Sequence, residues 1–262
     1  MRHFLLAIQF FTRIPITGRL ADWVGYSPAM LRASAAHFTG VGCVVAAVAA
    51  GVYAALAAAL APSPWACAVA AVGSTIATVL LTGGFHEDGL ADTADGLGGS
   101  ADRERALDIM KDSRLGAYGA MAITLALLAK CALLALLGAH SLSAALAGIA
   151  GAHVLSRLWP LLIMRSLPHV GDTARSKSKP LADQISGPAL GVAVSWCFVP
   201  LALVYQAQAA SFLIAGAAAS ALVAAWLRGV FARRLGGFTG DCLGAAQQAG
   251  EIAFYLGAAL TL

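Results

Sequence analysis

The sequence predicts an all-α integral membrane protein, a polytopic helical bundle with about seven transmembrane helices and an N-terminal interfacial helix. Only 11% of the 262 residues are charged and 60% are hydrophobic, whereas an ordinary soluble domain carries about a quarter charged residues. Apolar runs long enough to cross a bilayer core of roughly 30 Å recur along the chain. They occupy residues 38–61, 65–82, 117–139, 143–164, 187–206, 210–227 and 243–262.

The N-terminal segment differs from these runs. Its short apolar stretch is followed by charge and Pro15 without a small-residue cleavage site, so we expect that it is not removed as a signal peptide. We expect instead a helix at the membrane surface, with its arginines facing lipid head groups. Its inward face would consist of Phe4, Leu5, Ile8 and Phe11.

The connections between the runs alternate in charge. Those at 62–64, 140–142 and 207–209 hold no Lys or Arg, whereas the N-terminal segment and all longer connections carry several. By the positive-inside rule we expect the N-terminus and every long connection in the cytoplasm, with the C-terminus on the opposite side of the cell (inner) membrane. Because no internal repeat or linker divides the sequence, residues 1–262 are expected to form a single membrane domain.

The strongest functional signal is acidic and lies in residues 83–119. Asp88, Asp92 and Asp95 are spaced i, i+4, i+7, which places three carboxylates on one stripe of a helix without a cation between them. Hard oxygen ligands with no cysteine nearby favour Mg²⁺ or Mn²⁺, whose coordination shell substrate phosphates normally complete. The pattern predicts a metal site for phosphoryl or nucleotidyl transfer. The alternative is a solvated surface helix, although such helices usually interleave Lys with Glu.

Residues beside the stripe are further candidates. His86 could act as a general acid or base, or donate to a phosphate, but a histidine at a membrane interface is as often structural. Glu87 lies about 100° away from Asp88 around the helix, so it is either a secondary site candidate or a solvated residue. Asp108 and Asp112 could bring two more carboxylates to the stripe from the next helix end.

Basic residues offer ligands for a phosphate. Arg114 could bind a phosphate through its guanidinium fork, or it could anchor lipid head groups. Charges at membrane depth are costly and usually functional or paired. Arg157, one turn from His153 in the fourth run, is therefore predicted to bind a pyrophosphate. Lys130, inside the third run, is expected to extend its amine to the membrane surface.

The last apolar run begins with a polar motif. Asp241 starts it on the same side of the membrane as the acidic stripe, either as a site residue or as a helix N-cap. Gln247, Gln248 and Glu251 follow at helical spacing. Such a polar stripe in an apolar span is expected to line a cavity.

These motifs resemble one family over nearly the whole chain. The string HEDGLADTADG at 86–96, followed by RERALDIMKDSRLGAYG at 103–119, is similar to the signature region of the cobalamin synthase (adenosylcobinamide-GDP ribazoletransferase) family. Three other stretches agree with the resemblance. They are QFFTRIPI at 9–16, Ser156-Arg157, and RRLGGFTGDCLGAAQQAGE at 233–251.

The resemblance implies a magnesium-dependent transferase of a phosphate-linked cobinamide group in cobalamin biosynthesis. Its expected substrates are adenosylcobinamide-GDP and α-ribazole or its 5′-phosphate, and its products adenosylcobalamin or its phosphate, and GMP. It also implies a lipid environment, no nucleic-acid partner, and either self-association or association with other cobalamin-assembly enzymes.

The resemblance also assigns roles to residues. It makes Asp88, Asp92 and Asp95 the Mg²⁺ positions, with Asp112, Arg114 and Asp241 as further site residues. In the mechanism that we expect, Mg²⁺ bridges the carboxylates and the pyrophosphate while one acid takes the proton of the attacking ribose hydroxyl. Asp112 is the predicted base because it lies near the stripe but off it. The segment 169–177 departs from the acidic, glycine-bearing run typical of the family.

Two other functions fit parts of the pattern. Asp92-x-x-Asp95-Gly96 and Asp108-x-x-x-Asp112 are similar to the acidic pattern of CDP-alcohol phosphotransferases, but the Ala-Arg pair of that family is absent. Seven spans with polar residues would also suit an ion-coupled transporter. Against transport, the acids lie at one edge of the membrane and no inverted repeat is present.

Overall fold

The computed structural model describes residues 1–171 and 185–262, and the regular structure within them is helical. The cations expected in the connection after the fourth run, Arg175, Lys177 and Lys179, lie outside the described residues. In order, the helices are α1 (Arg2–Phe11), α2 (Gly18–Val24), α3 (Pro28–Ser34), the 3₁₀ helix η1 (Ala35–His37), α4 (Phe38–Ala59), α5 (Ala66–Thr82), α6 (Phe85–Gly99), α7 (Arg103–Met110), α8 (Ala117–His140), α9 (Leu142–Ser166), α11 (Gly187–Ala207), α12 (Ala210–Leu235) and α13 (Gly240–Ala259).

All seven predicted apolar runs form helices, and the chain is a multi-pass membrane protein. Five helical stretches are each long and apolar enough to cross a membrane, and the bent pair of α5 and α6 gives a sixth candidate. The seventh run, α13, is not among these candidates because polar side chains interrupt it. It packs against α6, α8, α9 and α12, so it forms the centre of the bundle.

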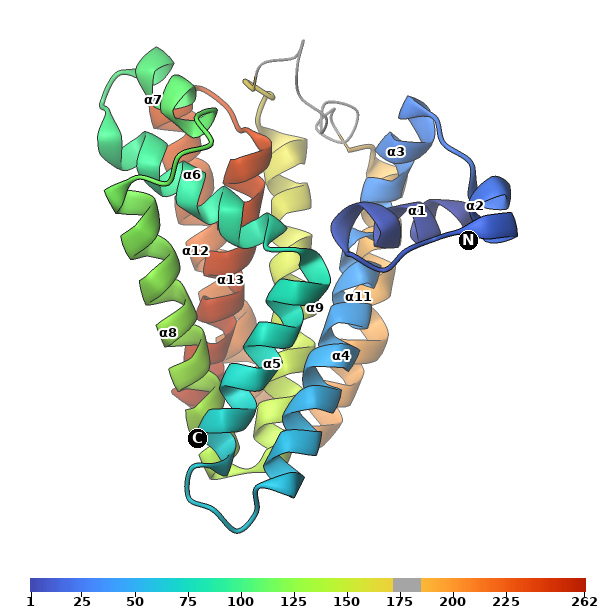
Figure 1. The fold of residues 1–262 in the computed structure, drawn as a ribbon, viewed down its shortest axis with the longest axis vertical. Helices are drawn as coiled ribbons and strands as arrows, with labels where there is room; N and C mark the ends of the chain where they lie inside the picture. Colours follow the sequence, from blue (N-terminus) through green and yellow to red (C-terminus); the bar gives the residue numbers. More distant parts are fainter. Residues whose placement is uncertain (172–184) are drawn as a thin grey trace.

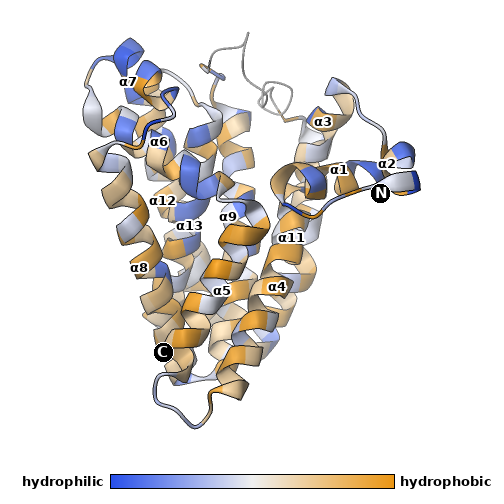
Figure 2. Cartoon of the chain, viewed as in Figure 1, coloured by the Kyte–Doolittle hydropathy of each residue, from blue (hydrophilic) through white to orange (hydrophobic). Residues whose placement is uncertain are grey.

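The two ends of the bundle differ. The α4–α5 and α8–α9 turns and the C-terminus lie at one end, whereas α1, α2, α3, α6 and α7 gather at the other (Figure 1). Hydrophilic residues are concentrated in the helices of that second end, and hydrophobic residues cover most of the long helices (Figure 2). This segregation agrees with a bundle that lies in lipid and carries its polar elements at one membrane surface.

Helix α1 lies across the upper part of α4 as the predicted interfacial helix (Figure 1). Ile8 and Phe11 are buried, and Phe4 is partly buried and stacks on Trp196 with ring centroids 4.8 Å apart. After α1, the Arg13 backbone N–H donates to the Leu81 carbonyl over 2.6 Å. The N-terminal segment is therefore attached to the end of α5.

The chain breaks sharply between α5 and α6, and this break was not predicted from the sequence. Gly83 and Gly84 adopt φ values of 70° and 71°, a left-handed conformation that favours glycine. The two helices consequently differ in direction by 89°. A Cβ on Gly83 would lie 2.2 Å from the Arg13 Nε, so the turn also needs the missing side chain. Helix α6 therefore turns away from α5 and runs across the bundle end.

Candidate active site

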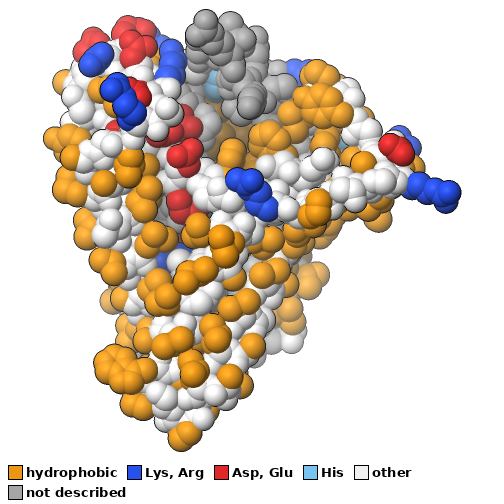
Figure 3. Space-filling view, viewed as in Figure 1, with side chains coloured by type: hydrophobic (Ala, Val, Ile, Leu, Met, Phe, Trp, Pro, Cys, Tyr) orange, Lys and Arg blue, Asp and Glu red, His pale blue; other side chains and the backbone are white. Residues whose placement is uncertain are grey.

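Helix α6 carries the acidic stripe at the polar end of the bundle. Asp88 is exposed, Asp92 is half-buried and Asp95 is buried, all within one continuous helix as predicted. Acidic side chains gather over this part of the surface, above a face that is otherwise largely apolar (Figure 3).

Asp241 joins these acids from the first turn of α13. Helices α6 and α13 approach closely here: a Cβ on Gly89 would lie only 2.9 Å from the Asp241 carbonyl oxygen. The N-cap of α13 is Thr239, whose side chain accepts from the Cys242 N–H at 3.3 Å. The alternative that Asp241 serves as the N-cap is therefore wrong, and its carboxyl is available to the site.

The acids perturb one another. Burial raises the pKa of Asp92 to about 7, and the charges of Asp241, Asp88 and Asp95 add to the shift. The ion pairs found among the described residues give no cation to Asp88, Asp92 or Asp241. The cluster therefore carries uncompensated negative charge, a situation that a bound cation relieves.

Asp95 has a different setting from the other two acids of the stripe. Its carboxylate accepts hydrogen bonds from the backbone N–H groups of Gly116 and Gly119, each at 2.8 Å. A Cβ at these two glycines would lie 2.4 and 2.3 Å from the carboxylate oxygens, so glycine makes room for the acid. Asp95 thus caps the N-terminus of α8, where negative charge is favourable.

The acids offer suitable donors for a hard cation but form no closed cage. No three His, Cys, Asp or Glu side chains converge into a metal-holding group in residues 1–171 and 185–262. Mg²⁺ is nevertheless usually held by only one or two carboxylates together with substrate phosphates and water. Uncompensated oxygen donors at Asp88, Asp92 and Asp241 fit that mode of binding.

The predicted base and its neighbouring arginine are paired with each other. The Arg114 Nε donates to both Asp112 carboxylate oxygens, at 3.0 and 3.1 Å. These hydrogen bonds hold the pKa of Asp112 at about 2, so its carboxylate has little tendency to take a proton. Asp108 similarly lies 3.7 Å from the Lys111 amine. Asp108 and Asp112 are therefore paired with neighbouring cations instead of extending the α6 cluster.

A second set of charges lies inside the bundle. The Lys130 amine is 2.7 Å from a Glu251 carboxylate oxygen, and both side chains are almost fully buried. The expectation that Lys130 extends to the membrane surface is wrong, because only 1% of it is exposed. Glu251 also accepts from the Tyr255 hydroxyl at 3.2 Å and lies 3.5 Å from the His153 ring.

The polar side chains of the α13 stripe are hydrogen-bonded to one another and to neighbouring helices. Gln247 donates to the Ser156 hydroxyl at 3.0 Å and to Glu251 at 2.9 Å, while Gln248 donates to Gln247 at 2.9 Å. Gln248 also donates to Glu87 at 3.0 Å, which links the buried charges to α6. Of the two alternatives for Glu87, the solvated one is wrong, because the residue is only 8% exposed. Buried polar groups require hydrogen-bond partners. The polar residues within this apolar run were therefore the signal in the sequence that Glu87 and Lys130 could be buried as their partners.

Three polar atoms near this region are buried and have no hydrogen-bond partner among the described residues: the His86 Nε2, the Glu87 Oε2 and the Arg157 Nε. Arg157 is 2% exposed, donates to the His153 carbonyl at 2.9 Å, and lies over the Phe38 ring at 5.6 Å. His86 stacks on the same ring at 5.7 Å. Buried unpartnered groups of this kind are costly, and they commonly mark positions that water or a ligand fills.

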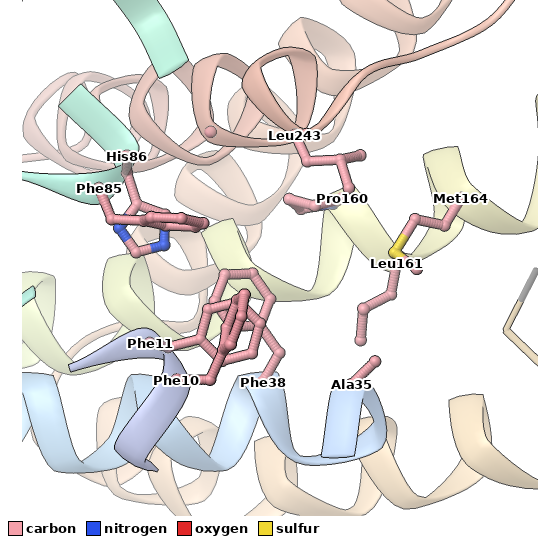
Figure 4. Close-up of a pocket in the computed structure, with 12 residues that line it drawn as sticks. Phe10, Phe11, Ala35, Phe38, Phe85, His86, Pro160, Leu161, Met164 and Leu243 are labelled. Atoms are coloured by element: carbon pink, nitrogen blue, oxygen red, sulfur yellow. The ribbon is translucent and has the colours of Figure 1, made fainter. Parts of the chain in front are cut away.

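Two cavities flank the start of α6. The first, here called the aromatic pocket, lies between α1, α4, α6, α9 and α13 (Figure 4). The second, here called the acidic cleft, lies beside the α5–α6 turn. The aromatic pocket is lined by Phe10, Phe11, Ala35, Phe38, Phe85, His86, Pro160, Leu161, Met164, Gly240, Leu243 and Gly244. The acidic cleft is lined by Gln9, Phe10, Thr12, Arg13, Thr82, Gly83, Gly84, Phe85, Glu87, Asp88 and Ile123.

The fold and the site together define a multi-pass membrane protein with an acidic site that favours cations at one end of a helical bundle. The sequence profile of the cobalamin-5-phosphate synthase family matches residues 3–259. The chain therefore belongs to this family, which confirms the resemblance seen in the motifs.

Curated relatives agree over the same span. An adenosylcobinamide-GDP ribazoletransferase of Polaromonas sp. (strain JS666 / ATCC BAA-500) is 60% identical over 275 residues, covering 100% of this chain and 98% of the relative. Proteins of the same name from Leptothrix cholodnii and Vibrio cholerae are 47% and 42% identical, covering 98% and 97% of this chain and 94% and 91% of their own lengths. No solved structure gives a significant match.

Proposed function

We propose that the protein is an adenosylcobinamide-GDP ribazoletransferase, as its relatives are named. It would move the adenosylcobinamide phosphate group from its GDP adduct to the ribose hydroxyl of α-ribazole or of α-ribazole 5′-phosphate, releasing GMP. The observation that carries the proposal is that two separate family motifs meet in space. Asp88 and Asp92 come from one motif and Asp241 from the other, and the three share one uncompensated cluster.

We propose that Asp88 and Asp92 hold Mg²⁺, with Asp241 beside them. When bound, Mg²⁺ would offset the charge of the pyrophosphate and of the leaving GMP. Asp95 was predicted as a third ligand, and its two hydrogen bonds to α8 support a positioning role instead. That role fixes the start of α8 against the acidic helix.

Arginines are the proposed phosphate ligands. Arg114 is exposed, and a phosphate could replace Asp112 as the acceptor of its guanidinium hydrogen bonds. Arg157 is buried with a free Nε among the described residues, so it would need an opening of the bundle to reach a phosphate. We therefore favour Arg114 as the direct ligand and Arg157 as a group that supports the site from within.

The proton acceptor is best sought among the unpaired acids. Asp112 is held by Arg114, and His86 lies among aromatic rings, so neither predicted catalytic residue is well placed to accept a proton. Asp88, Asp92 and Asp241 are free of cations in the described part of the chain. One of them could take the ribose proton as the pyrophosphate is attacked.

We further propose that the site faces the cytoplasm and that the C-terminus lies across the cell inner membrane. Helix α7 and the C-terminal end of α12 lie at the same bundle end as α6 and carry Arg105, Arg233 and Arg234. Cations on one side of a membrane protein normally mark the cytoplasmic side. Association with a second copy or with other cobalamin-assembly enzymes stays a prediction.

The direct test is a transferase assay on the purified full chain in detergent. Adenosylcobinamide-GDP and α-ribazole with Mg²⁺ should give GMP and adenosylcobalamin in equal amounts by chromatography, and EDTA should stop the reaction. A CDP-alcohol mixture offered in parallel should give no CMP. CMP release without the cobalamin product would support the phosphotransferase alternative. GMP formation in detergent, with no closed compartment, would exclude transport as the sole activity.

A further inference from the structure

The aromatic pocket has an unusual wall for a cavity at a membrane surface. Flat rings from three helices line one side of it, namely Phe10 and Phe11 of α1, Phe38 of α4, and Phe85 with His86 of α6. The Phe11 and Phe38 centroids are 4.4 Å apart, and the Phe38 and His86 rings are inclined by only 18°. The close-up shows these rings gathered opposite the aliphatic side chains of α9 and α13 (Figure 4).

The small volume and the aromatic lining of the pocket together favour a flat occupant. Water can reach about 60 Å³ of it, whereas ligand pockets commonly enclose about 300–1,000 Å³. A planar ring stacked against the phenyl groups needs less added space than a branched or bulky group. Aromatic rings attract one another in stacked and edge-to-face arrangements beyond the effect of buried area.

One residue of the lining, His86, carries a polar atom that a lipid chain would leave unsatisfied. His86 is 2% exposed, and its Nε2 is buried without a hydrogen-bond partner among the residues that the structure describes. An unsatisfied buried nitrogen costs free energy unless a ligand pairs with it. An acyl chain cannot satisfy this nitrogen, but a heteroaromatic ring with a free ring nitrogen can accept a hydrogen bond from an Nε2–H.

The pocket is also next to the acids of the proposed site. Phe10 and Phe85 line both the aromatic pocket and the acidic cleft, so one wall separates the two spaces. Asp88 lines the cleft, and Gly240 and Gly244, on either side of Asp241 in sequence, line the pocket. A ligand with an aromatic ring and a ribose could therefore place its ring in the pocket and its hydroxyl groups near the carboxylates.

We infer that the aromatic pocket binds the base of the acceptor nucleoside, with the His86 Nε2 donating to the free ring nitrogen of that base. The inference rests on the proposed function, in which the acceptor is α-ribazole. The base of α-ribazole is a substituted benzimidazole, a flat and mostly apolar bicyclic ring. Its second ring nitrogen is bonded to no sugar and can accept one hydrogen bond. His86 is then a specificity-determining residue for the acceptor, and Phe38 and Phe85 form the walls of the slot.

The test compares two acceptors that differ at one atom. Benzimidazole riboside carries the ring nitrogen, and indole riboside has a C–H group in its place. The full-length protein is assayed in detergent for GMP release at saturating adenosylcobinamide-GDP with each acceptor. We expect wild type to favour the benzimidazole acceptor in kcat/KM by about 10-fold, the effect of one net hydrogen bond. In His86→Phe, which keeps an aromatic ring but no donor, the preference should fall to about 1, and His86→Gln should retain part of it.

His140→Phe is the matched control. His140 is an exposed histidine at the C-terminal end of α8, at the opposite end of the bundle. The variant should keep the wild-type acceptor preference. Because the readout is a ratio of two acceptors on one protein, partial loss of folded enzyme does not change it.

Each outcome decides between explanations. If His86→Phe lowers kcat/KM for both acceptors equally, His86 acts in the chemistry or in folding, and the inference is overturned while the proposed function stands. If wild type does not distinguish the two acceptors, the pocket does not read the ring nitrogen and is best explained by a lipid chain. If wild type releases no GMP with either acceptor or with α-ribazole, the proposed function itself fails.

Discussion

Helix α13 contributes to two groups of charges, Asp241 to one and Glu251 to the other, and the two groups differ in whether their charges are compensated. The acids of α6 and the first turn of α13 lie at the bundle end with no cation paired to Asp88, Asp92 or Asp241 in the described residues. Inside the bundle, the Lys130 amine lies 2.7 Å from Glu251, and the polar groups around the pair are hydrogen-bonded to one another.

The difference separates architecture from function. A compensated network inside the membrane needs nothing further, and it holds α8, α9 and α13 together through specific partners. Uncompensated acids repel one another, so they persist where something outside the chain supplies the opposite charge. Glu87 belongs to both regions, because Gln248 donates to one of its oxygens and the other is buried without a partner in the part that the structure describes.

The largest effect should follow from removing charge at the uncompensated site. Asp92→Asn keeps the size of the side chain and removes a proposed Mg²⁺ ligand, so GMP release should fall by more than about 100-fold, the upper range for losing an outer-shell metal partner. Purification yield and helical circular dichroism should stay as in wild type. Asp88→Asn should behave in the same way.

Asp108→Asn is the matched control for these two variants. Asp108 is an exposed acid at the same bundle end that pairs with Lys111, so its removal should change the rate less than about 3-fold. Near-normal turnover in either Asp88→Asn or Asp92→Asn would remove the metal assignment.

The compensated region should respond in stability instead. Lys130→Met leaves the buried Glu251 carboxylate without its lysine partner. Breaking a buried ion pair in this way costs about 3–5 kcal/mol. Unfolding by SDS titration in mixed micelles measures the loss. The double variant Lys130→Met/Glu251→Gln should recover much of it, because the remaining amide is neutral and can still bond with Gln247 and Tyr255.

An exposed pair supplies the comparison for Lys130. Lys111→Met removes a surface partner of Asp108 and should cost at most about 1 kcal/mol. Equal destabilisation by Lys130→Met and Lys111→Met would show that the buried pair does not hold the helices together. Failure of the double variant to recover stability would show that the lysine acts by packing and not by charge.

The sequence predicted the membrane bundle and the acidic helix because both depend on local patterns. The seven apolar runs and the i, i+4, i+7 stripe need only the composition of one segment and the helical period. The sequence could not show which acids are neutralised. Asp112 meets Arg114 two residues away, whereas Lys130 and Glu251 are 121 positions apart in the sequence and meet only in the packed bundle.

The turn into α6 was missed for a related reason. Gly83-Gly84 was visible in the sequence, but a glycine pair allows a sharp bend without requiring one. The bend is fixed by the N-terminal segment, whose Arg13 backbone bonds to Leu81 and whose side chain lies against Gly83. That contact joins residues about seventy positions apart, so no local pattern contains it.

Asp95 gives a smaller and more discriminating test. If it caps α8, Asp95→Ala should lower the free energy of unfolding by about 1–2 kcal/mol, as for other helix caps, and Asp95→Asn by less. The Mg²⁺ concentration for half-maximal GMP release should not change in Asp95→Asn. A rise of 10-fold or more in that concentration, with unchanged stability, would restore Asp95 as a metal ligand and extend the uncompensated cluster to the whole stripe.

The smallest effect concerns the pH dependence of the metal-free protein. The pKa of Asp92 is raised to about 7 in the fold, above the ordinary aspartate value of 3.8 that applies in the unfolded chain. Stability from this group is therefore fully present below about pH 4 and is lost as the pH rises through 7, because the unfolded chain then binds fewer protons.

In EDTA, the difference in melting temperature between wild type and Asp92→Asn should thus change between pH 5 and pH 8. The melting temperature of wild type should fall relative to that of the variant at the higher pH. Adding Mg²⁺ should stabilise wild type more at pH 8 than at pH 5, because the ion competes with the proton for the same carboxylate. A difference that stays constant with pH would mean that Asp92 is already compensated in solution. The contrast between an uncompensated acidic cluster and a compensated buried network would then fail at Asp92.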